Sequence, residues 1–224
     1  MQRVISCCFY WYFMVKFMGV YDEGKNMKKQ VVIIGGGDTF ETYDIFLEQL
    51  KNSEFHLDRC ISNNRDWKTW IRTMLGEEYE VIIPSMPNSA NAQYAEWKIV
   101  FEKMIPFLND GVILAGHSLG GSFLAKYLSE NVFPKKIQGV FLVAGAFDRD
   151  TAGYSLASFT LPKKLDLQTK NVYLYQSKDD PVVPFSALES FRKAFPFAHI
   201  RIFENLKHFN HEEFPELLSD LLAP

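Results

Sequence analysis

The chain has 224 residues, of which 47% are hydrophobic and 23% are charged, a mixture that excludes disorder and collagen-like repeats. Its 24 Lys and Arg against 27 Asp and Glu give a net charge of -3, so no overall positive field exists to bind nucleic acid or an anionic bilayer. Three cysteines, two of them adjacent at Cys7 and Cys8, form no disulfide framework and favour a reducing compartment. We therefore expect a cytoplasmic protein with one main domain.

The first 26 residues differ from the rest of the chain. Val4 to Val20 is almost wholly apolar and aromatic, but at about 17 residues with an interior Lys16 it lies at the lower limit of a membrane span. No cleavage pattern of small residues follows it. Met27 directly precedes a strand-like run, as at the start of many compact domains. We assign residues 1–26 to a hydrophobic extension, either upstream sequence or a weak anchor, and residues 27–224 to the folded domain.

Six short runs rich in Val, Ile, Leu, Phe and Tyr predict buried strands. They are Val31–Ile34, Glu80–Ile83, Val112–Ala115, Gly139–Val143, Val172–Tyr175 and Ile200–Phe203. Helix-period segments separate several of them, and no run of hairpin signals occurs. This alternation predicts a three-layer, doubly wound α/β domain with a mainly parallel sheet, whose functional residues lie in loops at the carboxyl ends of the strands.

Two apolar stripes at helical spacing predict helices that pack on this sheet. The first stripe comprises Phe40, Tyr43, Leu47 and Leu50, and the second comprises Phe214, Leu217, Leu218, Leu221 and Leu222. Asp38, followed three residues later by Glu41, predicts a capping box at the start of the first helix. We expect the last helix to cover the sheet as a C-terminal lid.

Gly116-His117-Ser118-Leu119-Gly120 is the strongest chemical signal in the chain. It lies between a predicted strand and a predicted helix, which is the context of a nucleophile elbow. Glycines at 116 and 120 avoid collisions with the neighbouring strand and helix, and the turn lifts the Ser118 hydroxyl out of the sheet. The amide of Leu119, at the N-terminus of the helix, is placed to donate to an oxyanion.

A serine nucleophile needs a histidine base and a carboxylate that orients it. Asp180 follows the fifth predicted strand and His208 follows the sixth, so the order Ser, Asp, His is that of an α/β-hydrolase. Asp179 is the alternative acid. His211 competes with His208, but its place before two glutamates suits capping of the final helix better than catalysis.

Gly35-Gly36-Gly37 lacks the residues that complete a Walker loop or a dinucleotide fingerprint. In a hydrolase this loop supplies the second oxyanion donor, for which we choose the Gly37 amide, with Asp38 as the alternative. His208 and His211 lack metal-site spacing, and Cys60 has no elbow or nearby histidine, so we expect no metal, no cofactor and no thiol nucleophile.

The motifs Gly-His-Ser-Leu-Gly, Asp-Pro-Val-Val-Pro and Lys-His-Phe resemble those of the α/β-hydrolase superfamily. Together with Met86-Pro87-Asn88, Tyr94 and Trp97 they are similar to the small, nearly lidless serine hydrolases typified by retinoblastoma-binding protein 9 and YdeN. The resemblance covers nearly all of 27–222. It implies Ser118 as nucleophile, Asp180 as acid and His208 as base. Many superfamily members have His-Gly after the first strand, where this chain has Gly35-Gly36. Because of this difference, the resemblance does not assign the oxyanion donor in this loop.

The resemblance implies hydrolysis of an ester, thioester or amide through an acyl-serine, with a small-molecule acyl substrate as partner. Only Ala146–Thr169 is long enough to form a cap, so we expect a minimal lid. Candidates to line the site, or else to pack in the core, are Met86, Trp97, Phe147, Tyr154 and Phe159. Two other functions stay open: acyl transfer to an acceptor other than water, and a protein-interaction module with an unused triad. The oligomeric state is not predicted.

Overall fold

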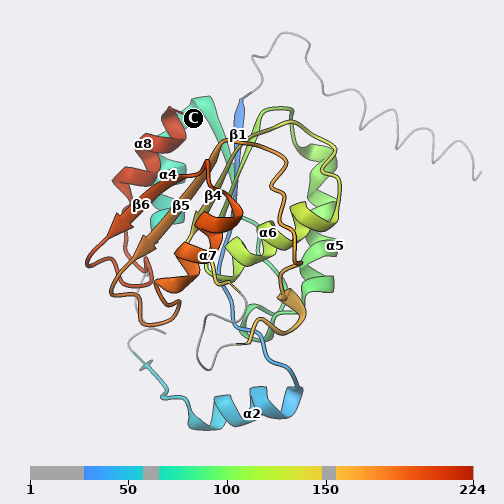
Figure 1. Ribbon diagram of the computed structural model, residues 1–224, viewed down its shortest axis with the longest axis vertical. Helices are drawn as coiled ribbons and strands as arrows, with labels where there is room; N and C mark the ends of the chain where they lie inside the picture. The colour runs from blue at the N-terminus through green and yellow to red at the C-terminus, as the bar shows by residue number, and fades with distance from the viewer. Residues whose placement is uncertain (1–27, 58–65, 148–154, 224) are drawn as a thin grey trace, which may run out of the picture.

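The computed structural model describes residues 28–57, 66–147 and 155–223, and its centre is one parallel sheet (Figure 1). The strand order is β2-β1-β3-β4-β5-β6, and every neighbouring pair is parallel. The strands are β1 (Lys29–Ile34), β2 (Tyr79–Ile82), β3 (Val112–His117), β4 (Ile137–Val143), β5 (Val172–Ser177) and β6 (His199–Phe203). All six predicted strands and the doubly wound α/β class are confirmed. The hydrophobic extension assigned to residues 1–26 lies outside the described residues.

Helices cover both faces of the sheet. On one face lie α4 (Trp67–Leu75) and α8 (Pro215–Leu222), and on the other lie α5 (Tyr94–Met104), α6 (Leu119–Glu130) and α7 (Ser186–Ala194) (Figure 1). Single-turn 3-10 helices occur at η1 (Gly76–Glu78), η2 (Ser89–Asn91), η3 (Ile105–Phe107) and η4 (Ala157–Phe159). Within the described ranges, no helix has both the length and the apolar character that crossing a membrane requires.

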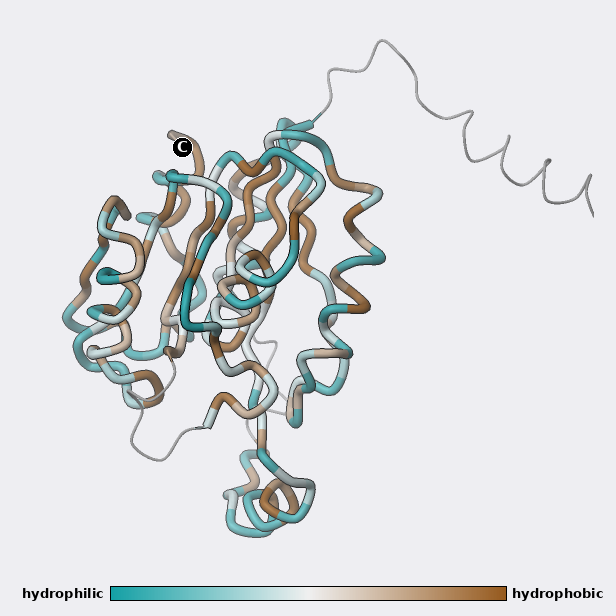
Figure 2. Tube along the Cα trace, turned by 45° about the vertical axis from the view of Figure 1, so that its right-hand side comes forward, coloured by the Kyte–Doolittle hydropathy of each residue, from teal (hydrophilic) through white to brown (hydrophobic). Residues whose placement is uncertain are grey.

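The alternation of side chains along each strand divides the core into two layers. On β1, Val31 and Ile33 pack with α4 and α8, while Val32 and Ile34 pack with α5 and α6. Because both faces are covered, the central strands are continuous apolar runs, and Figure 2 shows this apolar centre. The sequence signal for strands was strong for this reason.

The last helix packs on the sheet, as its apolar stripe predicts. Leu217 and Leu221 of α8 are buried, and Asp220 of the same helix accepts a hydrogen bond of 2.7 Å from the Tyr175 hydroxyl. Arg201 on β6 binds both carboxylate oxygens of Asp220, with Nη2 2.6 Å from Oδ1 and Nε 3.0 Å from Oδ2. The pKa of Asp220 is lowered, because these bonds outweigh its partial desolvation. The network fixes α8 to β5 and β6.

The predicted first helix differs from the observed one. Helix α2 (Tyr43–Asn52) begins after Thr42, whose hydroxyl accepts the Ile45 amide at 3.2 Å, so the Asp38–Glu41 capping box is wrong. Residues 38 and 39 are instead held outside the helix, because the Asp38 amide donates to the Ser89 carbonyl at 2.8 Å. None of residues 43–52 is buried, and α2 lies apart from the other helices (Figures 1 and 2). Its apolar stripe therefore does not pack on the sheet.

Candidate active site

Ser118 lies in the sharp turn between β3 and α6. Its φ of 54° and ψ of -124° place a non-glycine residue in a strained region of backbone conformation. A Cβ on Gly116 would collide with the Gly120 carbonyl, and a Cβ on Gly120 would collide with the carbonyls of Ile34 and Gly35. The turn therefore requires glycine at both positions, as the sequence pattern predicts.

A continuous chain of hydrogen bonds joins Ser118, His208 and Asp180. The Nε2 atom of His208 lies 2.9 Å from the Ser118 Oγ, and its Nδ1 atom lies 2.9 Å from Asp180 Oδ2 and 3.1 Å from Oδ1. The three residues come from the turn after β3 and from the loops after β5 and β6, at the carboxyl edge of the sheet. Ser118 and His208 are 7% and 8% exposed, so little water surrounds these bonds. With Nδ1 donating to the carboxylate, Nε2 is free to accept the serine proton.

The Asp180 carboxylate is buried and saturated with donors. Besides His208, its Oδ1 accepts the amides of Val182 at 2.8 Å and Val183 at 3.0 Å, and its Oδ2 accepts the Gln176 side-chain amide at 3.3 Å. These bonds fix the position of the carboxylate beside the imidazole and compensate for the lost hydration of its charge.

Asp179, the alternative acid, has a different position. Its Oδ1 accepts the Ser177 hydroxyl at 2.6 Å and the Lys207 backbone amide at 2.9 Å, and these two bonds are the leading causes of a lowered pKa. The carboxylate therefore braces the loop before His208 and does not contact the imidazole. His211 also braces this loop, since its Nε2 lies 3.0 Å from the Leu206 carbonyl oxygen. It does not cap α8, whose N-cap is Phe214, so the predicted capping role is wrong.

The glycine loop after β1 lies beside the serine. A Cβ on Gly36 would lie 3.1 Å from the Ser118 Cβ, and a Cβ on Gly37 would lie 2.6 Å from the Ser89 carbonyl oxygen. The backbone therefore approaches its neighbours more closely than a side chain would permit. The alternative oxyanion donor, the Asp38 amide, already donates to the Ser89 carbonyl and is excluded.

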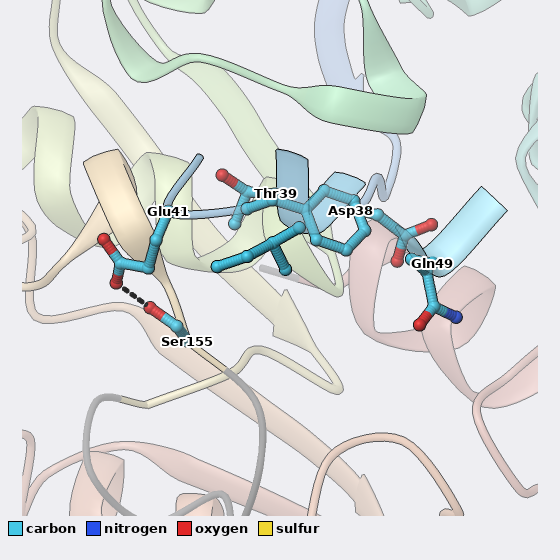
Figure 3. A pocket seen from close by; sticks show the side chains of 7 residues that line it. Asp38, Thr39, Glu41, Gln49 and Ser155 are labelled. Atoms are coloured by element: carbon cyan, nitrogen blue, oxygen red, sulfur yellow. Dashed lines mark hydrogen bonds between the residues drawn. The ribbon is translucent and has the colours of Figure 1, made fainter. Parts of the chain in front are cut away.

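A cavity of about 460 Å³ extends from this loop along α2 (Figure 3). Its lining comprises Asp38, Thr39, Phe40, Glu41, Ile45, Gln49 and Ser155. The Ser155 hydroxyl donates a hydrogen bond to the Glu41 carboxylate across the cavity. Partial desolvation raises the pKa of Asp38, and attraction to His208 acts in the opposite direction. Asp38 therefore connects this cavity electrostatically with His208.

The five residues that could line the site or pack in the core occupy different positions. Trp97 and Phe159 are fully buried in the core, with ring centroids 5.1 Å apart, and Phe147 packs edge-on against Phe191 at 4.9 Å. Met86 is partly buried against the same core. Tyr154 lies outside the described residues. Thus the fully buried pair contributes to packing rather than to a substrate surface.

His117 is the part of the site that the sequence argument missed. Its Nε2 atom lies 2.9 Å from the carbonyl oxygen of His208, and its ring centroid lies 5.1 Å from that of His208. The pKa of His117 is lowered to about 3, chiefly by burial and then by repulsion from His208 and Lys68. The available signal was a titratable residue inside an otherwise apolar strand, immediately before the serine.

A strained serine turn in a parallel six-stranded sheet, with a histidine from a later loop in contact with the serine and an aspartate from another loop in contact with that histidine, defines the class of α/β-hydrolases. The serine hydrolase family model matches residues 61–217, and the chain belongs to this family. YdeN of Bacillus subtilis (strain 168) is 26% identical over 130 residues, which cover 56% of this chain and 68% of YdeN. The predicted resemblance is confirmed.

Solved structures agree on the fold. The crystal structure of YdeN has a TM-score of 0.64 at 19% identity, and the match covers 88% of this chain and 98% of the YdeN chain. A YdeN-like protein of Pectobacterium atrosepticum has a TM-score of 0.61 at 15% identity, over 88% of this chain and 90% of its own. A serine hydrolase without a lid from Xanthomonas campestris has a TM-score of 0.51 at 15% identity, over 88% and 81%. At such identities these structures establish the fold alone.

Proposed function

We propose that this hydrolase cleaves a small ester, thioester or amide through an acyl-serine intermediate, with Ser118 as nucleophile, His208 as general base and Asp180 as the orienting acid. The observation that carries the proposal is the chain of 2.9 Å contacts from the serine oxygen through both imidazole nitrogens to a buried carboxylate. A serine hydroxyl is a weak nucleophile, and such an arrangement is what activates it.

The proposed reaction has two steps. The Ser118 Oγ attacks the acyl carbon while His208 Nε2 takes its proton, and the imidazolium then returns that proton to the leaving alcohol, thiol or amine. Water next attacks the acyl-serine while His208 Nε2 takes its proton, and the imidazolium returns that proton to the Ser118 Oγ as the bond to the acyl carbon breaks and the acid leaves. We assign stabilisation of the negative oxygen in both steps to the backbone amides of Leu119 and Gly37. The N-terminus of α6, which begins at Leu119, favours the same negative charge.

We further propose that the cavity along α2 holds part of the substrate. It begins at Asp38, next to the glycine loop that approaches Ser118, and it combines the apolar side chains of Phe40 and Ile45 with polar groups. Its volume of about 460 Å³ lies in the range of small-molecule sites. Of the described residues that line it, the charged ones are the carboxylates Asp38 and Glu41.

The charge of this lining predicts a preference against anionic substrates. Replacing Asp38 by asparagine is expected to raise kcat/KM for an anionic ester about fivefold relative to a neutral ester of the same size. The factor corresponds to about 1 kcal/mol for one charge pair near solvent. Glu78→Gln, which removes the same charge at the amino edge of the sheet, is the control and should leave this ratio unchanged. An equal ratio in wild type and Asp38→Asn would contradict the placement of the substrate.

Labelling with a fluorophosphonate tests the nucleophile and the base together. Intact-mass analysis of the wild type should show one covalent adduct, which peptide mapping should assign to Ser118. His208→Ala should remain unlabelled over the same time, because its serine has no base. Absence of an adduct on folded wild type would refute the hydrolase mechanism and favour an interaction module. Labelling combined with product formation only in the presence of an acceptor alcohol or amine would indicate acyl transfer instead.

A further inference from the structure

His117 is a buried titratable residue for which the proposed reaction has no use. It ends β3, and it is 5% exposed. Its low pKa, about 3, keeps the imidazole neutral at the pH of any ordinary assay. The nearest polar partner of its Nε2 is the His208 carbonyl oxygen at 2.9 Å, and a carbonyl oxygen only accepts. The Nε2 atom therefore carries the proton and donates it to this carbonyl.

The backbone around His208 needs such support. Lys207 and Phe209, on either side of it, have φ values of 48° and 54°, which non-glycine residues rarely adopt. Each strained residue costs roughly 1–3 kcal/mol and persists only where surrounding contacts impose it. The local turn contributes one such contact, from the Phe209 amide to the Leu206 carbonyl at 2.8 Å.

Further contacts come from two separate strands. From the end of β5 and the loop after it, Ser177 Oγ accepts the Leu206 amide at 3.0 Å, and Asp179 accepts the Lys207 amide at 2.9 Å. From β3, His117 binds the carbonyl on the other side of the base. The peptide segment that carries the imidazole is therefore held both before and after His208, while Asp180 holds the ring.

We propose that His117 is a positioning residue, which fixes the backbone of His208 through a neutral Nε2–H donor and thereby aligns the imidazole with the Ser118 hydroxyl. The inference rests on the proposed function, since it assigns His117 a role only if His208 is the base. A lysine or arginine could also donate here, but its charge would repel the imidazolium that forms at His208 during the reaction. A neutral histidine supplies the bond without that repulsion.

His117→Gln and His117→Asn test whether the hydrogen-bond donor must reach the His208 carbonyl, or whether any polar side chain at residue 117 is enough. The Nε2 of glutamine reaches about as far as that of histidine, whereas the amide of asparagine is one methylene shorter. We expect His117→Asn, and likewise His117→Leu, to lower kcat about 10- to 100-fold, because a displacement of about 1 Å in a catalytic group has an effect of this size. KM should change less than threefold. His117→Gln should recover most of kcat.

The measurements are kcat, KM and the rate of fluorophosphonate labelling, at a temperature where circular dichroism shows each variant to be folded. The acid limb of the rate should be the same in His117→Gln as in wild type, because His117 stays neutral over that range. The inference is overturned if a folded His117→Asn or His117→Leu keeps kcat within twofold of wild type. It is also overturned if His117→Gln is as slow as His117→Asn. Wild type that does not label would instead refute the proposed function.

Discussion

Ser118→Ala is expected to lower kcat by a factor of roughly 10⁴ to 10⁶, because no other group at the site can form the acyl intermediate. The change removes one oxygen and leaves the proposed oxyanion donors and the proposed substrate cavity in place. KM should therefore stay within a few-fold of wild type, and a small residual rate above that of water should persist. Turnover of a chromogenic ester at saturating substrate measures the loss.

Ser122→Ala is the matched control for this prediction. Ser122 is a fully buried serine of α6 whose hydroxyl donates to the Ala146 carbonyl at 2.7 Å. Its removal is expected to lower the free energy of unfolding by about 1–3 kcal/mol, because a buried acceptor loses its partner, but to leave kcat within a few-fold of wild type. Retained turnover in Ser118→Ala, or an equal loss in Ser122→Ala, would refute Ser118 as the nucleophile.

Trp97→Ala is expected to cause the largest loss of stability, about 3–5 kcal/mol in the free energy of unfolding. Its indole is fully buried among Phe123 and Phe159, and its Nε1 donates to the Pro87 carbonyl at 2.8 Å. Alanine would therefore leave both a cavity and an unpaired carbonyl. Urea unfolding followed by far-UV circular dichroism measures the change.

Ile99→Ala provides the comparison on the same helix. Ile99 is 55% exposed, so its truncation should change the free energy of unfolding by less than about 0.5 kcal/mol. A loss below about 1 kcal/mol in Trp97→Ala, together with a raised KM, would mean that Trp97 contacts substrate rather than filling the core. In that case the buried position described above would not be its position in solution.

The strands were predictable because their signal is local and strong. A central strand of a covered parallel sheet must be apolar on both sides, so runs such as Val31–Ile34 stand out without any knowledge of their neighbours. The serine turn was predictable for a related reason. Gly116 is required by the close approach of β3 to the start of α6, and Gly120 by the close approach of α6 to the end of β1. This requirement leaves a spaced pair of glycines in the sequence.

The errors arise where a group forms a hydrogen bond with a partner other than the one that its local pattern predicts. Asp38 and Glu41 have the spacing of a capping box, but hydrogen bonds between Asp38 and the Ser89–Ala92 segment hold residue 38 outside the helix. The same bonds occupy the Asp38 amide. His211 has a local pattern suited to capping, yet its imidazole bonds to the Leu206 carbonyl. Local pattern cannot reveal such competition.

Helix α2 forms part of a cavity wall without forming part of the hydrophobic core. It contributes Ile45 and Gln49 to the cavity wall, but none of its ten residues is buried, so it adds little to the core. Substitutions on this wall should therefore alter the shape and polarity of the cavity at almost no cost in folding. If the cavity binds substrate as proposed, a library confined to these two positions varies selectivity while every member keeps the sheet, the serine turn and the histidine loop intact.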